Sequence, residues 1–338
     1  MKRLADFALI IFSLLSLLNA AATAARAEIY TSPDGHRFEV NLIPDKPEII
    51  VGEPIYLSFE VKNLSDVDLG ILDGGDYRNR LGRPLSFSIK AVRDDGSEVP
   101  VPEINISMGG LISYRKAPKN GKHTFRLFLP LWAPFTEPGN YKISCRKNLK
   151  INDYRKADFS GDTFEKMWSG GVPVNLETAL KVLPKDYEKM GKVIKFREAQ
   201  LKSSDTDEAV KALIFIEDKR IIDPLISVSG FNSAALLRLA HFDDEKAFQA
   251  ITAQLYSNDR PIRFSAVEAL SDSRHPRAAE YILKMKDDED KMVRLRVMQF
   301  LGKTGTPETL KLLREMLLEE RNKEWERYVK QYLEKEKE

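Results

Sequence analysis

The side chains that most often bind metals or act in acid–base catalysis are few in this chain and far apart in its sequence. It contains one cysteine, Cys145, and four histidines, which are His36, His123, His241 and His275. A zinc site with three histidine ligands would need residues from distant parts of the chain. We interpret His275 as a helix cap and His123 as the first residue of a strand, and we expect neither a metal nor a cofactor.

The acidic residues form no recognisable catalytic or calcium-binding pattern. Three pairs lie close together in turns, where Asp accepts backbone hydrogen bonds. They are Asp73/Asp76, Asp94/Asp95 and Asp287/Asp288. The sequence also lacks the phosphate-binding glycine loop, the Gly-x-Ser-x-Gly nucleophile motif and the His-Glu-x-x-His zinc motif. It therefore favours a protein without enzymatic activity.

Two long connecting segments leave an alternative open. Residues 101–114 and 151–171 are longer than a hairpin needs, and long loops in compact domains are often functional. With Asp153, Asp158 and Asp162 they could form a carbohydrate-binding or hydrolytic site, in which two carboxylates roughly 5–10 Å apart flank a cleft. In the other interpretation the segments fold over the sheets and five aromatic residues fill a small separate core. These are Trp132, Tyr154, Phe159, Phe164 and Trp168.

The elements that must position these residues change character near Pro184. Between Phe38 and Leu183 apolar and polar residues alternate, as in half-buried strands. The alternating runs begin at Ile55, Leu85, Phe125, Tyr141 and Val174. Because no helix is expected between them, residues 28–184 predict an antiparallel β-sandwich. Cys145 lies on the same face as its apolar neighbours and is interpreted as a buried apolar residue.

After Pro184 the apolar period becomes helical, and a repeat of 31 residues appears between Phe231 and about Leu318. Apolar residues recur at this spacing in sets such as Leu239/Leu270/Leu301 and Ile251/Ile282/Leu313. A second series occupies the position of a helix N-cap. It comprises Asp244, His275 and Thr306. Each repeat is thus two helices and a turn, and such pairs must stack to bury their apolar faces.

One repeat reads Ala-Val-Glu-Ala-Leu at 266–270, turns at His275-Pro276 and continues as Ala-Ala-x-Tyr-Ile at 278–282. This pattern resembles short HEAT repeats, of the kind also found in phycobilisome-lyase-like proteins. The resemblance covers residues 207–338 and implies an α-helical solenoid that presents surfaces rather than a reaction centre. HEAT-like proteins that hold a di-iron centre use His-Glu pairs, but here Phe242 and Pro276 follow the histidines, so that carry-over fails.

Two motifs of the β region carry a second resemblance. Val51–Pro54 (VGEP) precedes an alternating strand, and Glu137–Tyr141 (EPGNY) opens another. The first resembles the start of an immunoglobulin-like domain, and the second resembles the entry to a tyrosine corner. The family's bridged cysteines and core tryptophan are missing, so the resemblance implies a bacterial-type variant. The predicted fold is an N-terminal immunoglobulin-like β-sandwich followed by a C-terminal HEAT-like solenoid.

The N-terminus has the pattern of a targeting segment. Residues 1–27 combine a basic start, an apolar run from Phe7 to Leu18 and Ala25-Arg26-Ala27 before Glu28. This order predicts a cleaved secretory signal peptide, because the apolar run is shorter than the ~20 residues that span a bilayer. An uncleaved anchor is the alternative. We expect an exported protein, periplasmic or extracellular, that does not span a membrane after cleavage.

Two further helices are expected at the ends of the repeat region. Residues 185–206 predict a linking helix, and Trp325 begins an apolar stripe that continues to Leu333. An open stack of helices needs such a terminal capping helix, although an amphipathic helix of this kind could also bind a partner.

The charges are balanced. The chain has 53 basic and 51 acidic residues, of which residues 1–27 hold three and one, which leaves 50 of each. Proteins that bind nucleic acid or anionic membranes carry a basic excess on one face. We therefore expect no nucleic-acid partner.

In HEAT-like stacks the second helix of each pair usually lines the concave face, so its exposed positions are candidates for contact with a partner. They form rows of mixed charge, which suit a complementary protein surface better than a phosphate backbone, or they form a solvated face that binds nothing. The candidates are Arg220, Lys246, Gln249, Arg277, Glu280 and Lys311. The leading hypothesis is a secreted, non-enzymatic protein-binding or scaffold protein, with its partner and oligomeric state left open.

Overall fold

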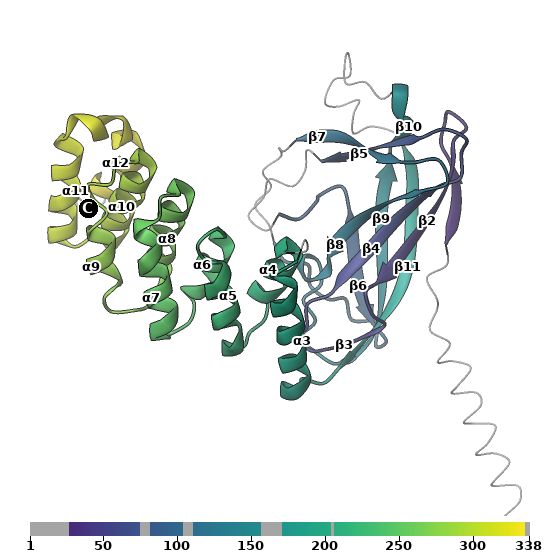
Figure 1. Ribbon diagram of the computed structural model, residues 1–338, viewed down its shortest axis with the longest axis horizontal. Coiled ribbons are helices and arrows are strands. Elements are labelled where there is room, and N and C mark those ends of the chain that lie inside the picture. Colours follow the sequence, from purple (N-terminus) through teal and green to yellow (C-terminus); the bar gives the residue numbers. More distant parts are fainter. Residues whose placement is uncertain (1–26, 75–81, 104–110, 157–170, 204–205, 335–338) are drawn as a thin grey trace, which may run out of the picture. The chain divides into compact units, whose positions relative to one another are not determined.

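The computed structural model describes residues 27–74, 82–103, 111–156, 171–203 and 206–334. The chain forms two compact units, Met1–Met190 and Gly191–Glu338, the first built from strands and the second from helices (Figure 1). The boundary falls within helix α3 (Tyr187–Gln200), inside the segment for which the sequence predicts a linking helix. The predicted signal peptide lies outside the described residues except for Ala27.

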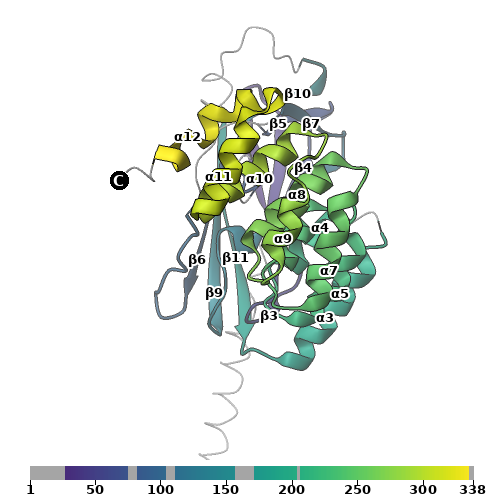
Figure 2. The ribbon, with the colours of Figure 1, turned by 90° about the vertical axis from the view of Figure 1, so that its left-hand side faces the viewer.

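The β unit contains three sheets, and its strands pair mostly in antiparallel fashion. The strand orders are β1-β2-β4-β8, β10-β5-β7 and β3-β11-β9-β6, and Figure 2 shows β6, β9 and β11 side by side. The bounds are β1 Glu28–Thr31, β2 Arg37–Pro44, β3 Glu48–Ile50, β4 Tyr56–Asn63, β5 Leu69–Gly74, β6 Ser88–Arg93, β7 Ile112–Ala117, β8 Lys122–Phe128, β9 Gly139–Leu149, β10 Ile151–Asp153 and β11 Val172–Leu183.

Alternating side chains explain how these strands form a core. Phe38, Val40 and Leu42 of β2 are buried, whereas the residues between them are partly exposed, as the side-chain period of a strand requires. Cys145 of β9 is also buried, and this burial raises the pKa of its thiol to about 12. Cys145 is therefore an apolar core residue, as the sequence predicts.

The predicted tyrosine corner is present. The Tyr141 hydroxyl donates a hydrogen bond to the carbonyl oxygen of Glu137 at 2.9 Å, which ties the start of β9 to the loop before it. The Tyr141 ring also meets Phe135 edge-on, with ring centroids 4.8 Å apart.

Only two members of the predicted aromatic core behind the long loops, Trp132 and Tyr154, lie in the described residues. Trp132 is buried, and its indole N–H donates to the Phe87 carbonyl at 3.3 Å. Tyr154 instead is 39% exposed. The other three members of the predicted cluster, Phe159, Phe164 and Trp168, lie outside the described residues.

Two details of the predicted sandwich are wrong. The short strand β3 pairs with β11 in parallel, through Ile49 opposite Val182, so the unit is not wholly antiparallel. A strand of three residues is too short to show an alternating pattern, which is why the sequence does not reveal it. The run that begins at Leu85 enters a strand only at Ser88, because residues 85–86 form a turn.

The helical unit follows as successive pairs. Its helices, after α3, are α4 Thr206–Ile214, α5 Ile222–Val228, α6 Ser233–Leu239, α7 Glu245–Ala253, α8 Arg260–Asp272, α9 Ala278–Leu283, α10 Lys291–Thr304, α11 Pro307–Leu318 and α12 Glu326–Glu334. Leu239, Leu270 and Leu301, which repeat every 31 residues, are at most 1% exposed. The repeat in the sequence is thus a repeat in the core.

The successive pairs are α4/α5, α6/α7, α8/α9 and α10/α11, and the first helix of each pair packs on the first helix of the next. α6 contacts α8, α8 contacts α10, and α10 contacts α12. In Figure 1, α6, α8 and α10 follow the inner side of the curved row, and α5, α7 and α9 follow its outer side. This differs from the expectation that second helices line the inner side. In the pair α8/α9 the first helix has 13 residues and the second has six, and in α10/α11 they have 14 and 12, so in these two pairs the first helix offers the longer packing surface.

Two of the three predicted N-caps are confirmed. The Asp244 carboxylate accepts hydrogen bonds from the first turn of α7, and the Thr306 hydroxyl accepts one from Thr309 N–H in α11. Proline follows Thr306 as the first residue of α11, where its missing N–H costs nothing.

The prediction of His275 as the N-cap of α9 is wrong. The helix begins later, at Ala278. His275 Nδ1 instead accepts the N–H of Arg277 at 3.3 Å in the preceding turn. Its ring stacks on Phe248 of α7, with centroids 3.6 Å apart, so packing between pairs sets its position.

The C-terminal apolar stripe is divided between a 3-10 turn, Glu320–Trp325, and α12. α12 packs on α10 at Gly302, where a Cβ atom would lie 2.5 Å from the Tyr332 ring. The close approach of the two helices therefore requires glycine at this position.

Candidate functional site

The six candidate partner-binding residues lie on the second-helix side of the helical unit, and all are at least partly exposed. Arg220 is the least available. Its Nε and Nη2 atoms donate to Asp218 at 3.0 and 2.6 Å, and the Asp218 carboxylate also caps the turn before α5. Arg220 therefore belongs to the structure of that turn.

Lys246 links two successive second helices. Its ammonium lies 3.4 Å from the Asp223 carboxylate of α5, and both side chains are more than 70% exposed. An exposed ion pair of this kind contributes only about 0–1 kcal/mol, so a partner's charges can replace it at little cost.

Glu245 gathers two of the candidates, Arg277 and Gln249. Arg277 Nη2 donates to its carboxylate at 2.6 Å, and Gln249 Nε2 donates at 3.0 Å. His275 Nε2 lies 3.2 Å from the other carboxylate oxygen. The hydrogen bonds from Arg277 and then Gln249 lower the pKa of Glu245. Sequence reasoning did not include Glu245 among the candidates, because it selected one position per helix turn and chose the next residue, Lys246.

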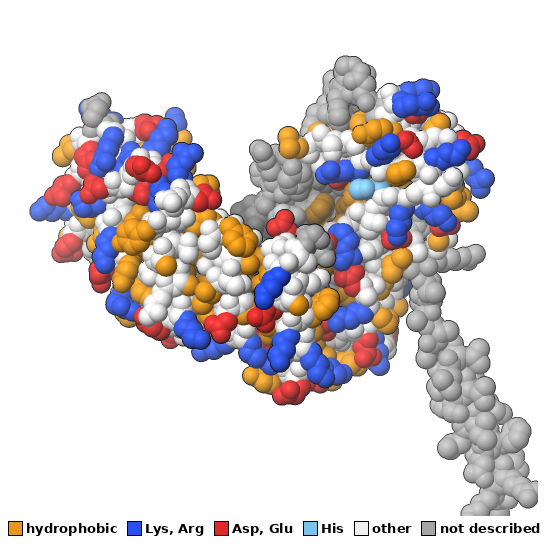
Figure 3. All heavy atoms as spheres, in the orientation of Figure 1, with side chains coloured by type: hydrophobic (Ala, Val, Ile, Leu, Met, Phe, Trp, Pro, Cys, Tyr) orange, Lys and Arg blue, Asp and Glu red, His pale blue; other side chains and the backbone are white. Residues whose placement is uncertain are grey.

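The remaining candidates are Glu280 and Lys311. Glu280 of α9 accepts a hydrogen bond at 2.8 Å from Nζ of Lys284, the C-cap residue of that helix, and Lys311 of α11 is exposed. Figure 3 shows the resulting mixture of blue and red side chains along the helical unit. The structure thus joins Gln249 and Arg277 through the shared carboxylate of Glu245, whereas Lys246 pairs with Asp223 and Arg220 with Asp218.

Two buried arginines, also missed by sequence reasoning, hold the turns between helix pairs. Arg263 Nη1 donates to the Ser257 carbonyl at 2.8 Å, and its other nitrogens reach Asp288. Arg294, 31 residues later, donates to the Asp288 carbonyl at 2.8 Å and to Asn322 Oδ1 at 2.8 Å. Their spacing is visible in the sequence and could have been recognised as part of the repeat.

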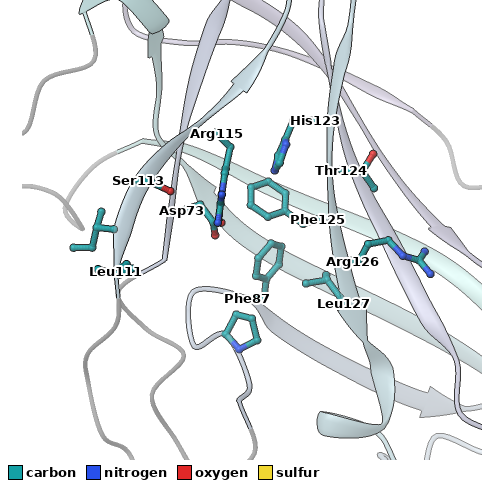
Figure 4. Close-up of a pocket in the computed structure, with 12 residues that line it drawn as sticks. Asp73, Phe87, Leu111, Ser113, Arg115, His123, Thr124, Phe125, Arg126 and Leu127 are labelled. Carbon is teal, nitrogen blue, oxygen red and sulfur yellow. The ribbon is translucent and has the colours of Figure 1, made fainter. Parts of the chain in front are cut away.

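A second candidate site is a groove in the β unit, with a volume of about 720 Å³. Its walls come from β7, from β8 and from the segment before β6 (Figure 4). Phe125 and Leu127 project from β8 toward Phe87, and the Phe87 and Phe125 rings meet at 5.5 Å. The floor is therefore apolar.

The charged groups at this groove are neutralised within the protein. Arg115 Nε donates to Asp73 at 3.0 Å, and Arg126 donates to both carboxylate oxygens of Asp45 at 2.7 and 3.0 Å. Burial lowers the pKa of His123, whose ring meets Phe125 edge-on at 4.7 Å. His123 is therefore neutral at pH 7.

The groove only partly overlaps the site that the sequence suggested for the two long loops. Leu111, Ile112 and Ser113, at the end of 101–114, line it, but no described residue of 151–171 does. Asp153 is buried and its carboxylate binds Arg155 at 3.0 Å. Asp158 and Asp162 lie outside the described residues.

Two searches of the described residues gave negative results. No group of three or more His, Cys, Asp and Glu side chains in that part of the chain could hold a metal ion. No helix in that part is both long and apolar enough to cross a bilayer.

Comparisons with known proteins match part of the helical unit to a family model. No curated protein matches the chain. Among solved structures it is similar to Spo0M, a sporulation control protein from Bacillus subtilis, at 14% identity and a TM-score of 0.19. The match covers 48% of this chain and 54% of that one, so the chain spans about half the length of that protein. Residues 259–331, from α8 to α12, match the family model of HEAT repeats.

Proposed function

We propose that this chain is an exported, non-enzymatic protein-binding or scaffold protein, with an immunoglobulin-like sandwich in its β unit and a HEAT-like solenoid in its helical unit. The match to HEAT repeats supports the second assignment, and HEAT repeats often mediate protein interactions. The tyrosine corner at Tyr141 supports the first.

The observation that carries the proposal is the series of exposed, oppositely charged pairs that joins successive second helices. Asp223–Lys246 joins α5 to α7, and Glu245–Arg277 joins α7 to the turn before α9. Each pair is exposed and individually weak. A protein surface with complementary charges can exchange these contacts for its own, which gives specificity and fast association rather than great affinity.

The test is cross-linking of the native protein in its own envelope, followed by mass spectrometry and by purified binding of any partner identified. Lys246→Glu combined with Arg277→Glu should weaken that binding at least tenfold. The control is Lys142→Glu with Lys181→Glu, which alters two similarly exposed and paired lysines of the β unit. Equal binding by both double variants, or recovery of the protein alone at every salt concentration, contradicts the proposal.

The alternative is a carbohydrate-binding or hydrolytic protein with a site in loops 101–114 and 151–171. One observation favours it, namely that Leu111–Ser113 line the groove. The burial of Asp153, whose carboxylate is bound by the exposed Arg155 side chain, opposes it, because a catalytic carboxylate must reach its substrate. Oligosaccharide binding that is abolished by Asp158→Asn or Asp162→Asn, and not by the lysine and arginine reversals, would support the alternative.

A further inference from the structure

Strands β7 and β8 follow each other in the chain but belong to different sheets. The turn between them is closed by a hydrogen bond from Gly121 N–H to the Pro118 carbonyl at 2.8 Å. β7 then pairs with β5, and β8 pairs with β4. Two strands that would ordinarily form a hairpin therefore separate, and the apolar groove lies between them (Figure 4).

Within the described residues, β8 is the last strand of its sheet. The bonds at both ends of its ladder define which residues face β4: Asn63 N–H donates to Gly121, and Leu129 N–H donates to Ile55. In an antiparallel ladder the alternate residues point their backbone groups the other way. The N–H and C=O of Thr124 are thus directed away from β4, at the edge that borders the groove.

The side chains beside this edge define what can bind there. Phe87, Phe125 and Leu127 form an apolar floor, and Leu111 on the other wall is 80% exposed. The charged groups are paired inside the protein, as described above for Arg115 and Arg126. The groove therefore combines a backbone edge with an apolar floor and with charged side chains that already have partners.

We propose that this groove binds an extended segment of a partner protein, which adds to β8 as a further strand. The backbone of the segment would bond to Thr124, and alternate apolar side chains would enter the space over Phe87, Phe125 and Leu127. Main-chain bonds supply affinity in this mode of recognition, and the side-chain pockets select the sequence. A saccharide would find few unpaired side chains for its hydroxyl groups, because the charged side chains at the groove bind one another, and an acyl chain would leave the Thr124 amide unbound.

This inference concerns the β unit and does not depend on the proposed function of the helical surface. The charge reversals at Lys246 and Arg277 leave the groove unchanged, and the variants below leave the helical surface unchanged. The two proposals can therefore fail separately.

The experiment is selection of displayed random octapeptides on the full chain, followed by affinity measurements with the synthetic peptides. Thr124→Pro removes the N–H that points into the groove but no hydrogen bond to β4. Thr124→Ala retains that N–H and is the matched control. We expect selected peptides with alternating apolar residues that bind Thr124→Ala normally and bind Thr124→Pro about tenfold less tightly, the effect of losing one hydrogen bond.

A second measurement keeps the protein unaltered. Peptides with N-methyl groups on alternate residues retain their side chains but lose every second backbone N–H donor. Because only alternate N–H groups of an added strand face β8, the peptide methylated on the residues that face away should bind, and the peptide methylated on the residues that face β8 should not. In addition, the bound peptide should slow hydrogen exchange of the Thr124 amide. The proposal is overturned if no peptide is selected, if both methylation patterns bind equally, or if a fatty acid or an oligosaccharide occupies the groove with no protection of Thr124.

Discussion

Arg263 and Asp288 form an ion pair in which both side chains are only 7% exposed. Arg263 lies in the first turn of α8, and Asp288 lies in the turn that precedes α10. The same arginine donates to the Ser257 carbonyl, so one side chain connects the turns on both sides of a helix pair.

This pair leads to a prediction about stability. Arg263→Leu leaves the Asp288 carboxylate buried without its counter-ion, and the loss of one partner of a buried pair costs about 3–5 kcal/mol. The free energy of unfolding, measured by urea titration with circular dichroism at 222 nm, should fall by that amount.

The matched control is Arg260→Leu in the same helix. Arg260 is 70% exposed and lies 3.2 Å from Asp290, so its removal should cost less than about 1 kcal/mol. Equal losses in the two variants would show that the Arg263–Asp288 pair has no special role.

Gly302 allows a second prediction. Gly302→Ala places a methyl group against the Tyr332 ring, where a Cβ would lie 2.5 Å away, and such overpacking costs about 1–3 kcal/mol. Hydrogen exchange in α12 should accelerate while exchange in α8 does not change. Gly230→Ala is the control, because its Cβ would meet only Gln254 Oε1 at 3.8 Å. Unaltered protection of α12 in Gly302→Ala would contradict this packing.

His123 makes the stability of the β unit depend on pH. Its burial lowers the pKa in the folded protein, so the unfolded chain binds the proton more tightly. The resulting stabilisation is present above the usual histidine pKa of about 6.5 and is lost as pH falls below it. Asp73 opposes this shift and Arg115 supports it.

We therefore expect the β unit to be less stable at pH 5 than at pH 7.5, and His123→Gln to remove part of that difference. Thermal unfolding at the two pH values, followed by near-ultraviolet circular dichroism, measures it. His36→Gln is the control, since it alters the other histidine of this unit. The same pH difference in wild type and His123→Gln would contradict the prediction.

Local patterns in the sequence were enough to predict part of this fold. Strand alternation identifies the buried face of β4, and the 31-residue spacing identifies Leu239, Leu270 and Leu301 as core residues. Asp244 and Thr306 cap their helices because capping depends on only a few neighbouring residues. These features involve interactions over short distances in the chain.

The features that the sequence did not reveal depend on contacts between distant residues. The parallel pairing of β3 with β11 joins residues about 130 positions apart, and three residues carry no periodic signal. The groove exists because β7 and β8 join different sheets, which no pattern within either strand specifies. Arg263 looks like an exposed charge until its acceptor 25 residues later, Asp288, is known.

The spacing of Arg263 and Arg294 has a mechanical consequence. Arg263 of α8 binds the turn before α8 and the turn after α9. Arg294 of α10 likewise binds the turn before α10 and the turn after α11. Any force that lengthens the helical row must therefore break charged contacts in two turns together and expose a cation and its acceptors at once. We expect such a row to yield in steps of one whole helix pair rather than by gradual stretching.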